Sequence, residues 1–269
     1  WCIDVDDHWT VVCVVPPGDP WSAFMNDDGI IGFDTDELPE GPRLRGTVTV
    51  DASVDRVFDH MESALLVASR EAMMERGCFH LAVSGDLQLQ PFWRQLMYDP
   101  DARGLPWAST HLWFTEDWGL PDGDPRRTFT RLHDTIIAHS GLPLEQVHTM
   151  PVAQSGGAFT YIKEITEVTG GGLIERPGFD AVIVAAGPGG SVGGWQPGGL
   201  IDPDQGGLIV RHQGGPSGDD DGLSLALAGM SHAANLLVMV VGELAGASLR
   251  TTAWDDACPV SALHQGHGE

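Results

Sequence analysis

The stretch most suggestive of chemistry is a glycine-rich loop that follows an apolar run. Residues 187–194 read GPGGSVGG, and Ser191 lies at the centre of a G-x-S-x-G pattern. In serine hydrolases this pattern exposes a nucleophilic serine at the end of a strand. His212, His232 and His264 follow along the chain, together with several Asp residues. The order serine, acid, histidine is therefore available.

The residues after Ser191 argue against a serine hydrolase. The nucleophile turn of these enzymes leads directly into a helix that fixes the serine. Here VGGWQPGGLIDPDQGG follows at 192–207, and so many Gly and Pro residues disfavour a helix. A five-residue pattern also arises easily in a glycine-rich loop. A hydrolase that uses Ser191 is therefore kept only as a remote alternative.

Motifs for nucleotides and metals are not matched. A Walker loop needs Gly-Lys-Ser/Thr, whereas the only lysine, Lys163, lies in YIKEIT. The dinucleotide fingerprint G-x-G-x-x-G fails at Val192. The histidines of the terminal HQGHGE have Cys258 nearby, but terminal residues are usually frayed and solvated. We expect no cofactor and no metal ion.

The charge balance limits the partners. Asp and Glu total 38 against 14 Lys and Arg, which gives a formal charge of −24 over 269 residues. Nucleic acids and anionic membrane surfaces need clustered basic residues, so we expect neither as a partner. The same charge repels anionic small substrates unless a local basic pocket overrides it.

Cysteines and hydropathy bear on the cellular setting. The four cysteines show no CxxC spacing. Cys78 lies in the apolar CFHLAVS and is expected to be buried, while a Cys2–Cys13 pair stays open. No apolar run reaches the length of a membrane span. We expect a soluble protein of the cytoplasm or of an organelle interior, after removal of a leader.

The order of predicted elements indicates an α/β fold. Helical spacing of apolar residues runs from Val54, with Ser53 as the N-cap and Gly77 as the stop; further helices follow Pro91 and span 128–141. Continuous apolar runs predict a mostly parallel, Rossmann-like sheet flanked by helices. The predicted strands are GTVTVDAS (46–53), CFHLAVSG (78–85), STHLWFT (109–115), DAVIVAAG (180–187), GLIVRHQ (207–213), LSLALAG (223–229) and LLVMVVGE (236–243).

Three loops follow predicted strands, at 84–90, 115–127 and 187–194. In parallel sheets, ligands bind beyond the carboxyl ends of the strands. We therefore expect the three loops to form one mouth.

Residues 1–46 differ from the rest of the chain. They contain one candidate strand, in HWTVVCVVPP, followed by a stretch rich in turn-forming and acidic residues, and three of the nine tryptophans. We predict an N-terminal extension over 1–46 and a domain over 47–269. The extension is expected to contact protein partners in a larger assembly, since aromatic residues dominate interface energetics.

An ordered series of segments across 47–265 resembles a known family. The segments are RGCFHLAVSG, LPWASTHLWFTEDWGLPDGDP, PLEQVHTMP, GFDAVIVAAGPGGSVGGWQP, LSLALAGMSHAANLLVMVVGE and PVSALH. They are similar to the 6-phosphogluconolactonases, which belong with the glucosamine-6-phosphate isomerase-like α/β fold. The resemblance implies this fold and hydrolysis of 6-phosphoglucono-lactone in the pentose phosphate pathway.

The chain departs from this family at its reactive positions. Residues 84–86 read Ser-Gly-Asp where the family has Ser-Gly-Gly, and residues 115–117 read Thr-Glu-Asp where it has Asp-Glu-Arg. Gly189 and Ser191 occupy the positions of the family's Asp and of its His, the base that activates water. Lactone opening needs such a base, and the phosphate of the substrate needs cationic groups.

These departures predict a pseudoenzyme that has lost the reaction and acts as a structural or partner-binding subunit. The alternative is a working lactonase with a relocated base, at His212 or His232. Catalytic residues are left unassigned. The positions kept as ligand-binding candidates are Ser84, Gly85, Glu116, Arg126, Arg127, Gly187 and Gly190.

Overall fold

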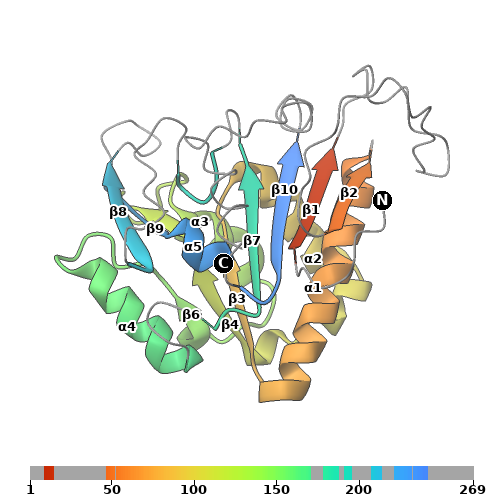
Figure 1. Ribbon diagram of the computed structural model, residues 1–269, viewed down its shortest axis with the longest axis horizontal. Helices are drawn as coiled ribbons and strands as arrows, with labels where there is room; N and C mark the ends of the chain where they lie inside the picture. The colour runs from red at the N-terminus through yellow and green to blue at the C-terminus, as the bar shows by residue number, and fades with distance from the viewer. Residues whose placement is uncertain are drawn as a thin grey trace.

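The computed structural model describes residues 9–14, 47–51, 53–170, 178–187, 191–195, 207–213, 221–231 and 233–241. A seven-stranded sheet forms its centre (Figure 1). All of its strand pairs are parallel. In spatial order the strands are β2 (Thr47–Asp51), β1 (Trp9–Val14), β10 (Leu236–Val241), β7 (Ala181–Ala186), β3 (Phe79–Val83), β4 (Thr110–Phe114) and β6 (Val147–His148).

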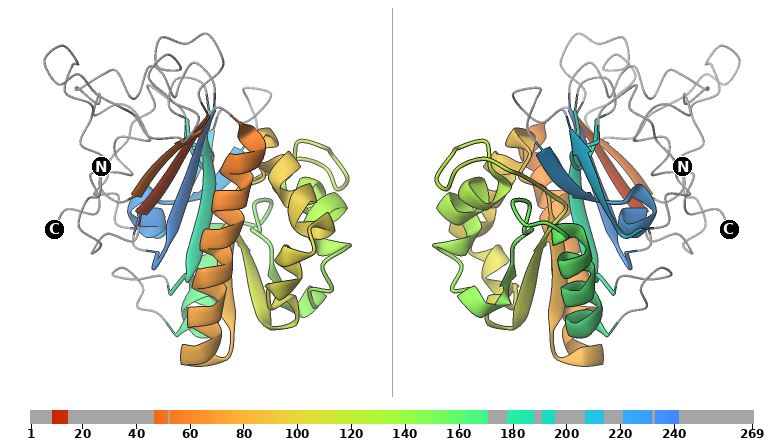
Figure 2. Two further views of the ribbon diagram at one scale, coloured as in Figure 1. Left: turned by 90° about the vertical axis from the view of Figure 1, so that its right-hand side faces the viewer. Right: turned by 90° about the vertical axis from the view of Figure 1, so that its left-hand side faces the viewer.

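Helices flank this sheet, which confirms the predicted α/β class. Figure 2 shows α1, α2 and α3 on one side of the sheet and α5 on the other. The helices are α1 (Val54–Arg76), α2 (Gln90–Tyr98), α3 (Thr128–Leu132), α4 (Gly157–Thr169) and α5 (Leu227–Ser231), and a π-helical turn, His133–Ile137, continues α3. Among the described residues, no helix is long and apolar enough to cross a membrane.

The centre of the sheet is the core of the molecule. Every residue of β3 and β7 is buried, as expected for strands covered on both faces. Helix α1 buries the apolar stripe predicted for it from Val57 on, whereas Val54 at its start is exposed. Gly77 ends the helix with φ +73, a conformation that glycine adopts without strain. Ser53 stands at the N-cap, but its side chain makes no capping hydrogen bond.

Four features differ from the expectations or go beyond them. The strand predicted over 223–229 ends at Leu225, and helix α5 begins at Leu227. A second, antiparallel sheet is formed by β5 (Glu116–Trp118), β9 (Asp221–Leu225) and β8 (Ile209–Gln213), so part of the predicted 115–127 loop is a strand. Helix α4 was not predicted, although Tyr161 and Ile165 lie one turn apart on its buried face. Cys78 is half-buried rather than buried, since it precedes β3 at the end of α1.

The boundary predicted at residue 46 stays a prediction. Strand β1 falls within 1–46, yet it pairs with β2 on one side and β10 on the other. Six residues of the predicted extension are therefore part of the main sheet.

Candidate functional site

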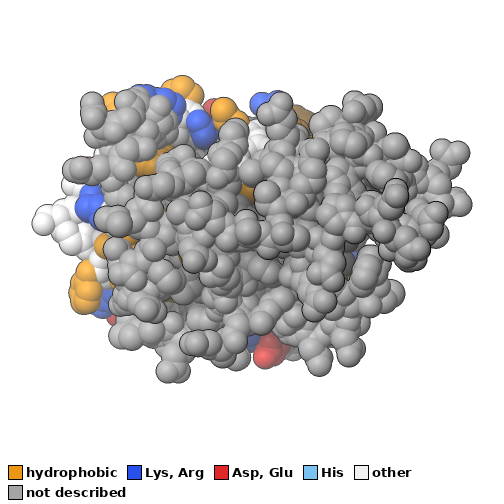
Figure 3. All heavy atoms as spheres, turned by 45° about the horizontal axis from the view of Figure 1, so that its top comes forward, with side chains coloured by type: hydrophobic (Ala, Val, Ile, Leu, Met, Phe, Trp, Pro, Cys, Tyr) orange, Lys and Arg blue, Asp and Glu red, His pale blue; other side chains and the backbone are white. Residues whose placement is uncertain are grey.

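The loops after β3, β4 and β7 begin at one edge of the sheet. These three strands are neighbours, and their carboxyl ends lie together at the top of Figure 1. Ser84 N donates to Ile183 O (3.0 Å), and Thr115 N donates to Val83 O (3.0 Å). The predicted convergence of the loops at 84–90, 115–127 and 187–194 is thus observed at the points where they leave the strands. In Figure 3, which brings this end forward, described basic side chains are visible at the upper left border.

Glu116 is a buried carboxyl group at the centre of this edge. Its Oε1 accepts hydrogen bonds from Ser84 Oγ (2.8 Å) and from Gly85 N (2.9 Å). Its Oε2 accepts a short hydrogen bond from Thr115 Oγ1. Burial raises the pKa of Glu116 to about 7, and these hydrogen bonds oppose the rise. The carboxyl group therefore joins the loop after β3 to the loop after β4.

Gly85 packs against the start of α3. A Cβ at this position would lie 2.8 Å from Thr128 Oγ1 and 2.9 Å from Thr128 Cα. Its carbonyl oxygen accepts a hydrogen bond from Arg131 Nη1 (2.9 Å), and Arg131 Nε donates to Pro125 O (2.8 Å). Only glycine fits here, and the space beside Gly85 is taken by the protein itself.

Asp117, which the sequence predicts to stand at the family's arginine position, is held by the protein on both oxygens. It is fully buried, and its Oδ1 accepts from Trp118 N and Thr128 N, each at 2.9 Å. Its Oδ2 lies 3.2 Å from Arg127 Nη2, and Arg127 Nη1 lies 2.5 Å from Asp122 Oδ1. Burial raises the pKa of Asp117, while the N–H bonds and Arg127 oppose the rise. Asp117 therefore fixes the start of α3, and Arg127 bridges two carboxylates.

Arg126 is likewise engaged by a carboxylate. Its Nε lies 3.0 Å from Asp124 Oδ1 and its Nη2 lies 2.7 Å from Asp124 Oδ2. This two-point hydrogen bonding lowers the pKa of Asp124 to about 2. Both arginines expected to be ligand candidates thus contact aspartates in the structure, and their role toward a ligand stays a prediction.

The described part of the glycine loop forms a tight turn. Gly187 N donates to Ser191 O (2.8 Å), and Val192 forms isolated bridges with Ala186 and Trp195. The half-buried Ser191 is thus followed by a bridged turn over 192–195, where a nucleophile elbow requires a helix. The missing helix counts against the serine hydrolase alternative.

Several predicted residues lie outside the description. Gly189, Gly190, His232, His264 and Cys258 fall in undescribed segments, as does Cys2. His212 and Cys13 lie in β8 and β1, but their side chains are not described. In the part of the chain that is described, no group of three or more His, Cys, Asp or Glu side chains is arranged to hold a metal ion.

Sequence reasoning missed two residues that shape this edge, Thr128 and Arg131. Both contact Gly85, from the first turn of α3 and its end. Thr128 directly follows the PRR segment (125–127), and Arg131 lies three residues further on. This spacing, which places both side chains on one helix face, was the available signal.

Comparison with known proteins agrees with the fold. Residues 52–269 match the family model described as glucosamine-6-phosphate isomerases/6-phosphogluconolactonase. The chain is 28% identical over 211 residues to the GDH/6PGL endoplasmic bifunctional protein of Oryctolagus cuniculus, covering 76% of this chain and 26% of that protein. The human protein of the same name is 27% identical over 210 residues, covering 75% and 26%. The chain thus spans about a quarter of the length of these relatives.

Solved structures are similar in fold at low sequence identity. The devB protein gives a TM-score of 0.67 at 17% identity, covering 79% of this chain and 89% of that one. The 6-phosphogluconolactonase of Trypanosoma brucei gives 0.66 at 12% identity, covering 84% and 94%. A monomeric glucosamine-6-phosphate deaminase gives 0.59 at 16% identity, covering 76% and 89%. At these identities the likeness concerns the fold alone.

Proposed function

Because the chain belongs to the glucosamine-6-phosphate isomerase/6-phosphogluconolactonase family, we propose that it is a 6-phosphogluconolactonase-like domain that no longer hydrolyses the lactone. It serves instead as a structural or partner-binding unit of a larger assembly. Since Trp9–Val14 lies in the sheet, the rest of 1–46 is the part that we assign to partner contacts.

The observation that carries this proposal is the engagement of the arginines beside the mouth. Arg126 is bound by Asp124, and Arg127 lies between Asp117 and Asp122. Arg131 is directed to backbone carbonyl groups. A phosphorylated substrate needs cationic donors, and these guanidinium groups would have to leave their partners to supply them. The substitution of the family's His and Asp by Ser191 and Gly189 removes the base as well.

One observation favours the alternative of a working lactonase. Glu116 has a pKa raised to about 7, which suits a group that exchanges protons near neutral pH. Against it, Glu116 is only 5% exposed and accepts three hydrogen bonds from neighbouring residues. These contacts favour a role in holding the loops.

Hydrolysis of 6-phosphoglucono-lactone between pH 6 and 8 tests the proposal. We expect no rate above the spontaneous one, because loss of a general base alone removes about a hundred- to ten-thousandfold. Ser191→His is expected to restore no activity, since the described arginines beside the mouth stay engaged by carboxylates and backbone carbonyl groups. Adding Asp117→Arg is not a useful rescue, because it removes the partner of Arg127 from a buried position.

Two variants separate the possible outcomes. A wild-type rate in the ordinary enzymatic range would overturn the proposal. If that rate inflected near pH 7 and fell in Glu116→Gln but not in the exposed control Glu145→Gln, Glu116 would be the relocated base. If Ser191→Ala abolished it, the serine hydrolase alternative would hold.

A further inference from the structure

Arg127 has two carboxylate partners that differ in exposure. Asp117 is fully buried and is held by two backbone N–H groups, and its Oδ2 lies 3.2 Å from Arg127 Nη2. Asp122 is fully exposed, and its Oδ1 lies 2.5 Å from Arg127 Nη1. The guanidinium group is therefore fixed from the interior by one carboxylate and covered from the solvent side by the other.

The Asp122 side chain is held by Arg127 alone in the described part of the chain. It belongs to the exposed segment 121–123. The backbone hydrogen bonds of this turn, from Asp124 N to Pro121 O (3.1 Å) and from Arg127 N to Asp124 O (3.0 Å), do not involve that side chain. Exposed ion pairs contribute little to stability. Rotation of the Asp122 side chain can therefore uncover Arg127 while the backbone stays in place.

The donors of Arg127 are not all satisfied. A guanidinium group carries five N–H donors, and each of the two aspartates contacts it through one oxygen atom. Arg127 Nε is buried and has no hydrogen-bond partner among the described residues. A phosphoryl group has three strong acceptor oxygens and binds arginine through charge-assisted hydrogen bonds. It therefore offers Arg127 more acceptors and more negative charge than the Asp122 carboxylate does.

Arg131 adds a second positive charge beside Arg127. It lies four residues further on, and this spacing places both side chains on one face at the start of α3. Its Nε donates to Pro125 O (2.8 Å), and its Nη1 donates to Gly85 O (2.9 Å). It forms no ion pair with a carboxylate in the part of the chain that the structure describes. Backbone carbonyl groups thus hold this guanidinium group at the loop after β3, while its charge stays available to a ligand.

We propose that Arg127 and Arg131 form a binding site for a phosphoryl group and that Asp122 is an autoinhibitory occupant of this site. Within 117–131 three aspartates accompany three arginines, so displacement of Asp122 leaves one positive charge in excess for a dianionic ligand. Asp122 is tethered five residues from Arg127, so its effective concentration at the guanidinium group is on the order of millimolar. A free phosphoryl ligand must reach a comparable concentration to displace it. This site goes beyond the proposed function, since it binds a ligand and performs no hydrolysis.

A titration of the full chain with inorganic phosphate, followed by phosphorus NMR, tests the site. Chloride keeps the ionic strength constant, so screening does not change along the titration. Asp122→Asn is expected to lower the Kd for phosphate by about three- to tenfold, because it removes the competing carboxylate and one negative charge. Asp134→Asn is the matched control and should leave the Kd unchanged, because Asp134 is also exposed but lies beside His133 rather than an arginine.

Two competitors identify the source of the phosphoryl group. Glucose 6-phosphate is expected to displace inorganic phosphate from Asp122→Asn, whereas glucose, which lacks the phosphoryl group, is not. Displacement by glucose 6-phosphate would identify a sugar phosphate ester as a ligand, and its failure would restrict the site to free phosphate. Displacement by glucose would overturn the proposal.

Hydrogen exchange measured by mass spectrometry locates the bound phosphate. In Asp122→Asn, phosphate is expected to slow the exchange of amides in 120–131 several-fold relative to chloride at the same ionic strength, with the amides of α1 as the reference. No gain of affinity in Asp122→Asn, an equal gain in Asp134→Asn, or protection confined to other segments would each overturn the proposal. A measured lactonase rate would overturn the proposed function but not this site, since the titration reports binding alone.

Discussion

The two ends of β3 and β4 carry buried polar clusters of opposite chemistry. At the carboxyl ends the groups are carboxyls, Glu116 and Asp117; at the amino ends they are imidazoles, His80 and His111 with His148. Each strand is five residues long, so the clusters are roughly 13–16 Å apart. Burial raises the pKa of Glu116 and Asp117 and lowers the pKa of His80 and His111, since it disfavours the charged form of each group.

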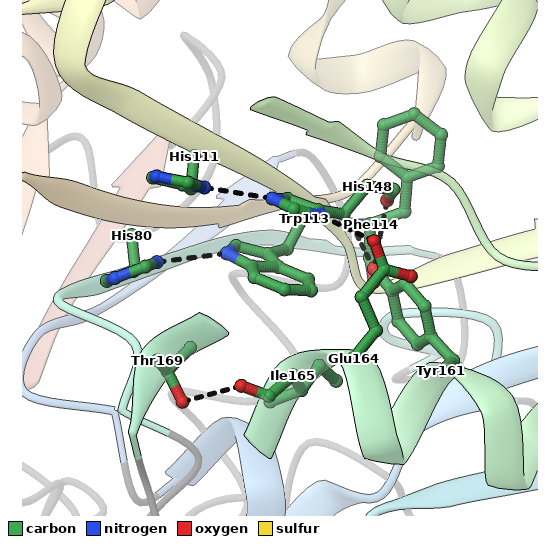
Figure 4. A network of polar contacts seen from close by, with 9 residues as sticks. All are labelled: His80, His111, Trp113, Phe114, His148, Tyr161, Glu164, Ile165 and Thr169. Carbon is green, nitrogen blue, oxygen red and sulfur yellow. Dashed lines mark hydrogen bonds and ion pairs between the residues drawn. The ribbon is translucent and has the colours of Figure 1, made fainter. Parts of the chain in front are cut away.

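The clusters also differ in what they hold together. The carboxylates accept from backbone N–H groups of Gly85, Trp118 and Thr128, and so fix the course of loops. The histidines contact other side chains, and so connect strands with a helix. Loops at the mouth are thus held by acceptors for their backbone, while the opposite edge is held by contacts between side chains (Figure 4).

The largest effect is expected from Asp117→Ala. The change leaves Arg127 without its buried partner and removes the acceptor of two backbone N–H groups. Breaking a buried pair costs about 3–5 kcal/mol. Urea unfolding should show this loss, whereas Asp122→Ala, which removes the fully exposed partner of Arg127, should show a much smaller loss. Equal losses of unfolding free energy in Asp117→Ala and Asp122→Ala would contradict a larger contribution of the buried partner.

A smaller effect is expected at the amino-end cluster, from His80→Asn. The folded-state pKa of His80, about 4, lies below the ordinary 6.5, so the unfolded chain binds more protons between these values. This group's share of stability is full above pH 6.5 and is lost as the pH falls toward 4, by roughly 3 kcal/mol.

His80→Asn keeps an acceptor for Trp113, whose Nε1 donates to His80 Nδ1, and does not titrate. Its unfolding free energy relative to wild type should therefore rise as the pH falls from 6.5 to 4, in urea titrations at each pH. The exposed control His139→Gln should show no such trend. A constant difference across this range would contradict the idea that His80 is held neutral.

An effect of similar size and opposite sign is expected from Glu116→Gln. The folded-state pKa of about 7 lies above the ordinary 4.5, so the folded protein binds more protons between these values. Stability is then lost as the pH rises from 4.5 to 7, by roughly 3 kcal/mol. Glutamine keeps an acceptor for Ser84 and Gly85. The free energy of unfolding of the variant should therefore increase relative to that of wild type as the pH rises from 4.5 to 7. If the unfolding free energies of the variant and of wild type changed with pH in parallel, the contrast between the two ends of β3 and β4 would not hold.

Local sequence signals predicted some elements well and others not at all. Helix α1 has a long apolar period and a glycine at its end, and it runs from Val54 to Arg76 as predicted. Helix α4 has an αL glycine, Gly170, at its end as well. Its interior, however, is rich in Thr, Ile and Val, which favour strands, and this composition hid the helical spacing.

The sequence predicted where the mouth lies but not the side-chain contacts that form it. The strand–loop order was enough to bring Ser84, Gly85 and Glu116 to one edge, because parallel strands end together. The pairing of Asp117 with Arg127 and the packing of Thr128 on Gly85 were not predicted. Both depend on where α3 lies on the sheet, which no local pattern encodes.

Residue types and their order were enough to indicate the α/β class and the family. They also predict an exchange of reactive residues at the mouth, which stays a prediction. The grouping of His80, His111 and His148 in one network becomes visible only in the folded chain. Each histidine alone is an ordinary strand residue; the register of β3, β4 and β6 places His80 beside His111 and Trp113 beside His148. Register between strands distant in sequence is set by packing across the whole sheet, and that packing brings Glu164 to the chain of histidines.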